Sequence, residues 1–348
     1  MSTRRIAVDA FGGDLCPAVE LEAAVRAVRE GIEVVLVGDR AQIEEGLARY
    51  KKQGRLPAIH HAPDRITMDD TPGKAIRAKP EASMPVCFDL VKAGDAAAVV
   101  SAGNSGAMLA CGLFKLKRIR GVDRPAIVTS FPNPKRATTL LDMGANVECR
   151  PVNLVQFAVM GAVYATLQHQ LARPRVAILA NGSEDSKGTE LTRAAHRVLK
   201  AHPSDHFDYV GYIEGQALFS GVIDVVVTDG FTGNVLLKTA EGTAAAIVDF
   251  LRTSVAASPL SSKLGALLMR PAFREFKRRA DPDTYGGAPL VGVEGIAIIC
   301  HGGASVKAVL NGIREADRFV RDGLAPGMRE AIDAHASLFA AARAEDTN

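Results

Sequence analysis

AVVSAGNSG, from Ala98 to Gly106, is the stretch of sequence that decides the fold. In it, a short apolar run is followed at once by small polar residues and glycines. Five other apolar runs end in the same way, at residues 6–9, 140–142, 176–179, 225–227 and 296–299. Ligands of open α/β sheets bind beyond the carboxyl ends of the strands, and glycines there let backbone N–H groups approach an anion. The six ends therefore predict one composite site for a small, oxygen-rich, anionic substrate.

Apolar, β-rich runs alternate with helical patterns along most of the chain. The expected strands are 4–9, 33–38, 57–61, 97–101, 126–130, 138–142, 175–180, 208–213, 222–228 and 295–300. The expected helices are 17–30, 41–52, 84–93, 106–118, 152–170, 189–201, 233–255, 261–279, 305–320 and 326–344. Strands that are apolar on both sides and separated by helices indicate a sheet covered on both faces. We therefore expect a three-layer α/β/α sandwich, with 1–325 as a single α/β/α domain and 326–348 as a C-terminal helix and tail.

One region interrupts this alternation, because two helical patterns follow each other between 233 and 280 without a strand. They predict an αα-hairpin that projects from the sheet domain. Its second helix, 261–279, carries leucines on one face and six Lys or Arg against one Glu. A basic amphipathic helix is typical of membrane-surface binding or of docking onto an acidic partner, and a core helix with a solvated basic face is the alternative. The residues expected to make these contacts are Leu264, Leu267, Leu268, Arg270, Arg274 and Lys277.

The composition narrows the class of protein. The 348 residues are 47% hydrophobic and 23% charged, with a net charge of +3 and no Trp, so nucleic-acid binding is not indicated. Five scattered cysteines form no Cys-x-x-Cys pair, and no His, Asp or Glu cluster has metal-ligand spacing, so we expect no metal and no cofactor. No signal sequence and no apolar run of transmembrane length is present, which predicts a cytoplasmic protein.

The polar residues at the strand ends supply candidate site residues. Asn104 or Ser105 can cap the following helix, and the same geometry offers N–H groups to a phosphate or an oxyanion. Lys187 precedes a helix, where a cation is unfavourable unless an anion binds there. Asn234 and Thr232 are suited to orienting a carbonyl and donating to a developing oxyanion, with a helix cap as the alternative interpretation.

Two further motifs are informative through what they lack. Residues 9–14, DAFGGD, follow the first strand, but the G-x-G-x-x-G spacing of a dinucleotide site is absent. A tight turn and a substrate-binding role remain open for this motif. Residues 182–189 have the composition of a P-loop but not its order, which argues against an NTPase. His301 follows the last expected strand and is either a structural histidine or a general acid or base.

In this order, these motifs resemble the phosphate acyltransferase (PlsX) family of bacterial phospholipid synthesis, from the first strand to about residue 320. The strings that carry the resemblance are residues 9–14, 68–70, 101–107, 142–147, 187–188, 229–234, 285–290 and 301–302. The chain departs from the family pattern at Phe11, in the 303–305 segment and in the 182–184 segment. The resemblance implies a fold related to isopropylmalate dehydrogenase and phosphotransacetylase, a homodimer and peripheral association with an anionic membrane.

The resemblance also implies a reaction, in which acyl-[acyl carrier protein] and inorganic phosphate give acyl phosphate and free carrier protein. A glycerol-3-phosphate acyltransferase would use the acyl phosphate downstream. Phosphate dianion is already a competent nucleophile, so the enzyme must mainly position the reactants and stabilise the oxyanion. The residues expected to act in catalysis are Lys187, Asn234 and His301. Those expected to bind substrate or phosphate are Asp9, Gly12, Gly13, Asn104, Ser105, Asp142, Asn146, Asp229 and Thr232.

Three other functions are weighed against this one. A phosphotransacetylase-like enzyme would use a coenzyme A thioester, and a non-catalytic scaffold would bind membrane through 261–279. A dehydrogenase is disfavoured by the missing dinucleotide fingerprint.

Overall fold

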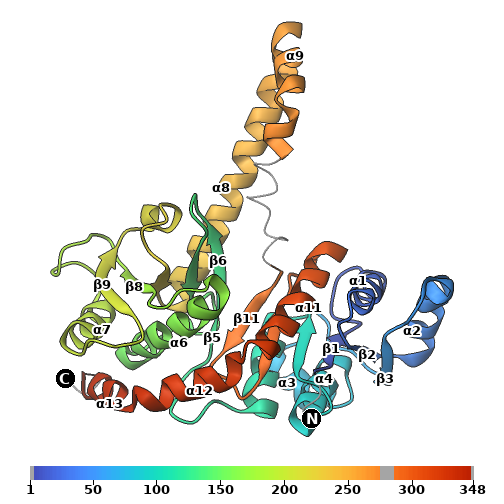
Figure 1. Cartoon of the computed structure of the whole chain (residues 1–348), viewed down its shortest axis with the longest axis horizontal. Helices are drawn as coiled ribbons and strands as arrows, with labels where there is room; N and C mark the ends of the chain where they lie inside the picture. Colours follow the sequence, from blue (N-terminus) through green and yellow to red (C-terminus); the bar gives the residue numbers. More distant parts are fainter. Residues whose placement is uncertain (1–3, 275–285, 346–348) are drawn as a thin grey trace.

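The computed structural model describes residues 4–274 and 286–345 (Figure 1). In this part of the chain the strands form two sheets. The first has seven strands in the order β3-β2-β1-β4-β12-β11-β5, and the second has five in the order β6-β7-β10-β8-β9. The sequence analysis expected a single sheet. Alternation of strands and helices is the same whether the strands join one sheet or two, so the pattern did not distinguish these cases.

The seven-stranded sheet is parallel over five strands. These are β3 (Ala58–His61), β2 (Val34–Gly38), β1 (Ile6–Asp9), β4 (Ala98–Ser101) and β12 (Ile296–Ile299). β11 (Ala288–Val291) pairs antiparallel with both β12 and β5 (Ala126–Ile127). β11 was not predicted, because it is short and contains Pro289, which a strand pattern disfavours.

The five-stranded sheet combines one antiparallel strand with four parallel ones. β6 (Thr129–Pro132) pairs antiparallel with β7 (Ala137–Leu141). β10 (Val225–Val227) pairs parallel with β7 and with β8 (Arg175–Leu179), and β9 (Asp208–Ile213) pairs parallel with β8. Only Val128 separates β5 from β6, so the predicted strand 126–130 is two strands that belong to different sheets.

Helices cover both faces of each sheet, as expected for an α/β/α sandwich. Along β1, Ile6 and Val8 pack with α1 (Ala18–Arg29) and α11 (Val306–Arg321) in one core cluster. Ala7 points the other way and joins a second cluster with α4 (Ser83–Ala93) and α5 (Ser105–Cys111). The seven-stranded sheet is flanked further by α2 (Arg40–Leu47), η1 (Ala48–Gln53), α3 (Pro72–Ala78) and η2 (Gly112–Leu116).

The five-stranded sheet has α6 (Pro151–His169) on one face, where Leu141 and Val225 belong to the same core cluster as Ile6. On the other face, Leu140 and Val226 pack with η3 (Gly215–Phe219) and with Leu236 near the start of α8 (Gly230–Ala257). α7 (Glu190–Ala201), α12 (Leu324–Ala334) and α13 (Ala336–Glu345) complete this half. The single C-terminal helix predicted over 326–344 is thus two helices, which meet at His335.

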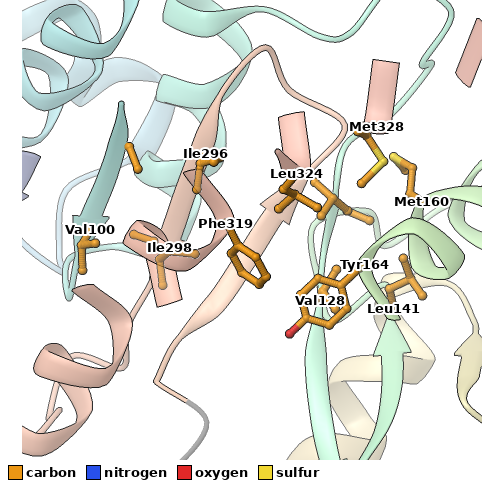
Figure 2. Close-up of a cluster of buried hydrophobic side chains, with 14 of the residues drawn as sticks. Val100, Val128, Leu141, Met160, Tyr164, Ile296, Ile298, Phe319, Leu324 and Met328 are labelled. Atoms are coloured by element: carbon orange, nitrogen blue, oxygen red, sulfur yellow. The ribbon is translucent and has the colours of Figure 1, made fainter. Parts of the chain in front are cut away.

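A single buried cluster joins the two sheets. Figure 2 shows Ile298 of the seven-stranded sheet, Phe319 of α11 and Tyr164 of α6 in one layer with Leu141 of β7. The rings of Tyr164 and Phe319 lie 5.6 Å apart. The same cluster also contains Met328 of α12 and Phe339 of α13, and the division at residue 325 stays a prediction.

The predicted hairpin projects from the rest of the molecule (Figure 1). α8 runs outward from the end of β10, and α9 (Leu260–Leu268) turns back beside it. The buried residues of α8 are Gly230 and Gly233, both in its first turn, and α9 has none. α9 ends at a turn at Met269, residues 270–274 are again helical, and the predicted remainder up to 280, including Lys277, lies outside the described residues.

Candidate active site

The structure divides the six polar strand ends into two groups of three. β1, β4 and β12 are neighbours in one sheet and run parallel. β7, β10 and β8 are neighbours in the other and also run parallel. Each group therefore forms one continuous edge at which three loops meet. We call them the first edge and the second edge.

The first edge is built around the buried carboxylate of Asp9. Its Oδ2 accepts a hydrogen bond from Ser101 Oγ at 2.7 Å, and its Oδ1 accepts one from the Phe11 N–H at 3.2 Å. Ser101 Oγ accepts in turn from the Gly103 N–H at 3.0 Å. Burial raises the pKa of Asp9. A Cβ at Gly12 would lie 2.7 Å from the Gly103 nitrogen, which explains the glycine at this close approach.

The loop after β12 is tied to the same edge. The Asp14 N–H donates to the Gly302 carbonyl at 2.9 Å. His301 is exposed, and its Nδ1 accepts from the Gly303 N–H at 3.1 Å. This bond fixes the ring and leaves Nε2, which bonds to no other described residue, as the nitrogen able to exchange a proton.

Asn104 is the N-cap of α5, as the sequence indicated. Its Oδ1 accepts from the Ala107 N–H at 3.0 Å, while its Nδ2 donates to the carbonyls of Met68 and Asp70 at 3.1 and 3.3 Å. The amide therefore fastens the 68–70 loop to the edge. Ser105 is exposed at the first helical position, and its hydroxyl is the freer of the two groups.

The second edge carries Lys187 and Asn234, in the loop after β8 and the first turn of α8. Lys187 is half-buried, and its stem lies so close to Gly182 that a Cβ there would be 2.7 Å from Lys187 Cγ. Asn234 is exposed beside Gly144 of the loop after β7. Neither side chain bonds to another described residue, so both have donors available to a ligand.

The loop that carries Lys187 is held on both sides. The Gly188 N–H donates to Asn181 Oδ1 at 2.9 Å, and its carbonyl accepts from Arg193 Nη1 at 2.6 Å. Thr189 then caps α7 by accepting from the Thr192 N–H at 3.3 Å. These contacts place the lysine directly before a capped helix N-terminus, as the sequence predicted.

Asp142 and Asn146 support this edge from inside. Asp142 is fully buried, and its carboxylate accepts four hydrogen bonds, from the N–H groups of Ile127, Ala145 and Asn146 and from Asn146 Nδ2. Burial raises the pKa of Asp142, which these bonds oppose. We expected both residues to bind substrate. That expectation stays untested. The hydrogen bonds of Asp142 and Asn146 favour a role in holding the loop after β7.

Asp229 and Thr232 also use their polar atoms locally. Asp229 Oδ1 accepts from the Thr232 N–H at 2.8 Å, and Oδ2 accepts from Thr232 Oγ1 at 2.8 Å. This pair caps α8 and fixes the direction in which the helix leaves the sheet. Direct contact of either residue with substrate remains a prediction.

Glu20 is a residue that the sequence analysis missed. It lies in the first turn of α1, the residue is 1% exposed, and its Oε1 lies so close to Gly13 that a Cβ there would collide with it. Burial raises its pKa to about 7. The sequence contained a signal for burial, because Glu20 lies between the apolar residues Val19 and Leu21, three residues after Pro17. A glutamate is nevertheless normally assigned to the exposed face of a helix.

The hairpin residues are as exposed as predicted. Leu264, Leu267 and Leu268 are 55%, 61% and 78% exposed, and Arg270 and Arg274 are exposed as well. Among residues 4–274 and 286–345, no helix has the length and apolar character needed to cross a membrane. In the same ranges no three His, Cys, Asp or Glu side chains are grouped so as to hold a metal ion.

Comparison with known proteins identifies the family to which this chain belongs. Residues 4–326 match the family described as "Fatty acid synthesis protein". The chain is 51% identical over 330 residues to the phosphate acyltransferase of Geobacter sulfurreducens, covering 94% of each chain. It is also 51% identical over 312 residues to that of Anaeromyxobacter dehalogenans, covering 89% of this chain and 85% of the relative.

Solved structures agree on the fold. The phosphotransacetylase of Streptococcus pyogenes superposes with a TM-score of 0.61 at 17% identity, covering 92% of this chain and 94% of the other. The EutD phosphotransacetylase of Staphylococcus aureus gives a TM-score of 0.57 at 17% identity, covering 91% and 94%. The protein is therefore an acyltransferase with a phosphotransacetylase-like fold. More particularly, the chain belongs to the phosphate acyltransferase family.

Proposed function

We propose that this enzyme converts acyl-[acyl carrier protein] and inorganic phosphate to acyl phosphate and free carrier protein. A phosphate oxygen attacks the thioester carbonyl carbon, the carbon–sulfur bond breaks, and the leaving thiolate of the carrier takes up a proton. The acyl phosphate then serves a glycerol-3-phosphate acyltransferase in the synthesis of phosphatidic acid. The observation that carries the proposal is the pair of unbonded donors, Lys187 and Asn234, at neighbouring strand ends in a chain of this family.

In this proposal the second edge stabilises the developing charge. Lys187 binds phosphate or the oxyanion, and Asn234 donates its amide N–H to the carbonyl oxygen as negative charge develops there. His301, on the first edge, supplies the proton to the thiolate through Nε2. The Ile127 N–H of β5 donates to Asp142 Oδ1 at 3.0 Å and so joins the second edge to the seven-stranded sheet, which supports the two edges acting on one substrate.

The site assignment is tested with purified Lys187→Ala and Asn234→Ala. Each should lower turnover by on the order of 10²-fold, because each removes a donor aimed at developing charge. Lys92→Ala, an exposed lysine in the last turn of α4, is the matched control and should keep wild-type turnover. Near-normal rates in both folded variants would refute the assignment.

The same assay separates the carrier-protein substrate from the coenzyme A alternative. Wild-type enzyme is given a matched acyl chain on acyl carrier protein and on coenzyme A, with phosphate, and the free thiol released is measured for each. We expect release from the carrier protein to be the faster. A preference for coenzyme A would establish the phosphotransacetylase-like function, and a lack of turnover with both would favour a scaffold.

We also propose that the protein is cytoplasmic and binds the anionic membrane surface through α9. The apolar side chains Leu264, Leu267 and Leu268 would enter the interface, and Arg270 and Arg274 would reach head groups. Because burial and charge both contribute, binding to phosphatidylglycerol vesicles should weaken with salt without disappearing.

Replacement of Leu267 and Leu268 by Glu should release the protein from these vesicles. Phe114→Glu is the control, since Phe114 is 60% exposed in η2, away from the hairpin. If the double variant still floats with the vesicles, the membrane proposal is wrong. If it leaves them but loses activity on soluble acyl carrier protein, the helix serves carrier docking.

A homodimer is proposed from the resemblance and from the exposed apolar surface of α8. Val248, Phe250 and Leu251 are 53%, 70% and 50% exposed on this projecting helix, and a single chain rarely leaves such a patch unpaired. Sedimentation at micromolar concentration should give twice the 36.8 kDa mass of the chain. A monomer would contradict the proposal.

A further inference from the structure

Three large apolar side chains are open to solvent around Asn234, and we call them the apolar rim. Phe231 and Val235 are 61% and 49% exposed in the first two turns of α8, and Val147, in the loop after β7, is 64% exposed. Residues three or four apart on a helix are neighbours, so Phe231 lies beside both Asn234 and Val235. An exposed apolar patch rimmed by polar groups marks an interaction or ligand-binding site.

Backbone contacts bring the loop after β7 to the start of α8. The Gly230 N–H donates to the Asn146 carbonyl at 2.7 Å, and the next residues along these two segments are Phe231 and Val147. The beginning of the same loop lies against Asn234. The loop and the first turn of α8 therefore form one surface, which carries both an amide donor and apolar side chains.

The described fold does not account for the exposed ring of Phe231. A hydrophobic staple pairs the residue before the N-cap with the fourth helical residue, whereas Phe231 is the second residue after the Asp229 cap. The buried cluster on this face of the sheet is met by Leu236 and Leu237 instead. Within the part of the chain that the structure describes, the ring has no packing role, so its contact is expected to be a ligand or a partner.

The proposed substrate supplies an apolar group at this place, because the acyl chain begins at the carbonyl carbon whose oxygen Asn234 is proposed to bind. The charges nearby also favour an uncharged occupant. The charged side chains of residues 230–241 are Lys238 and Glu241, which pair with each other at 2.9 Å. Glu148 is exposed next to Val147 and would repel an acidic macromolecule such as the carrier protein.

We propose that the apolar rim binds the first part of the acyl chain and makes the rate depend on chain length. This inference deepens the proposed function, on which it rests, by assigning a place to the acyl group of the thioester. Full burial of one methylene is worth about fourfold in affinity. A chain that is half-buried on an open surface should therefore gain about twofold per methylene, or about tenfold over four methylenes.

Phe231→Ser is the informative variant, because it removes the largest apolar side chain of the rim. Phe114→Ser is the matched control, since Phe114 is 60% exposed in η2, away from the second edge. For each protein kcat/KM is measured with butanoyl and octanoyl thioesters at saturating phosphate. Both chains are carried on acyl carrier protein and, in a second series, on coenzyme A.

The octanoyl to butanoyl ratio of kcat/KM should be about tenfold in wild type and in Phe114→Ser, and it should fall by about fivefold in Phe231→Ser. The loss should come mainly from the octanoyl substrate. An unchanged ratio, or an equal loss with both chains, overturns the inference, because a ring that only supported Asn234 would affect both substrates alike.

A second measurement needs no catalysis. Octyl phosphate and butyl phosphate carry a phosphate and an alkyl chain, and their binding is measured by calorimetry. Phe231→Ser should bind octyl phosphate about fivefold more weakly than wild type does and should bind butyl phosphate almost unchanged. Equal binding of octyl phosphate by the two proteins overturns the inference.

Two further outcomes are distinct from these. If the difference in octyl phosphate binding is found while wild type turns over neither thioester, the proposed function is wrong and the apolar site stands. If wild type sediments as a dimer and Phe231→Ser as a monomer, the rim is a contact with a second copy of the chain, and the inference is overturned.

Discussion

Glu315→Gln should make the protein markedly more resistant to unfolding at alkaline pH. Glu315 lies on α11, one turn before Phe319, and interacts with Tyr164. Figure 2 shows the rings of Phe319 and Tyr164 in the cluster that joins the two sheets. It is 6% exposed, and burial raises its pKa to about 8. Arg318 and the hydroxyl of Tyr164 act in the opposite direction without cancelling this effect.

The magnitude follows from the difference between the two states. In the unfolded chain the pKa is near 4.5, so between 4.5 and about 8 the folded protein keeps a proton that the unfolded chain releases. Because the unfolded state binds fewer protons, stability falls as the pH rises through this window. At about 1.4 kcal/mol per pH unit the full loss is about 5 kcal/mol, of which about 4 kcal/mol falls between pH 5 and pH 9. Such a loss is a large share of a typical free energy of unfolding.

The assay is urea unfolding of wild type, Glu315→Gln and Glu330→Gln at pH 5 and pH 9, at one protein concentration. Glu330 is an exposed glutamate of α12 and serves as the control. The free energy of unfolding of Glu315→Gln, relative to wild type, should increase by about 4 kcal/mol from pH 5 to pH 9. A change below about 1 kcal/mol, or an equal change in the control, would refute the reasoning.

Three further substitutions test the second edge, its sheet and the helix that leaves it. Gly233→Ala should destabilise the fold by about 2 kcal/mol or more, because its Cβ would overlap the carbonyl oxygen of Asp142. Gly242 lies in the same helix, and a Cβ there would meet no neighbouring atom. Gly242→Ala should therefore slightly raise the melting temperature. Asp224→Ala should cost about 1–3 kcal/mol in urea unfolding at pH 7, since it removes bonds of 2.8, 2.9 and 3.1 Å to Arg175. If Gly233→Ala or Asp224→Ala is as stable as wild type, the contact described for that residue does not contribute as argued.

The strand ends were predictable because their signal is local. A run such as AVVSAGNSG contains both the buried strand and the turn that follows it, so a helix cap at Asn104 or Ser105 could be predicted from the sequence, and the structure shows that it is Asn104. Which sheet a strand joins depends on contacts between distant segments. The alternation of strands and helices along the sequence carries no information about those contacts. The split between β5 and β6 therefore became evident only in the structure.

Buried acids were missed for a related reason. Glu20 and Glu315 both lie on the inner faces of their helices, where charged residues are rare. The spacing did contain a signal for Glu315, which is three residues after Gly312 and four before Phe319, both buried. A carboxyl on an apolar stripe indicates a buried polar environment, but only coordinates identify what it faces, here the backbone at Gly13 for Glu20.

The position of α8 bears on how the proposed activities relate to each other. The helix starts at the second edge, where its first turn carries Asn234, and it continues for 28 residues into the exposed hairpin. At 1.5 Å per residue this is about 42 Å of unbroken helix. Asn234 therefore lies at the base of the hairpin, and Leu267 lies on α9, in the part of the hairpin that projects from the rest of the molecule. Loss of vesicle binding without loss of turnover in the Leu267 and Leu268 variant would show that the hairpin and the second edge work independently, whereas joint loss would assign the hairpin to carrier docking.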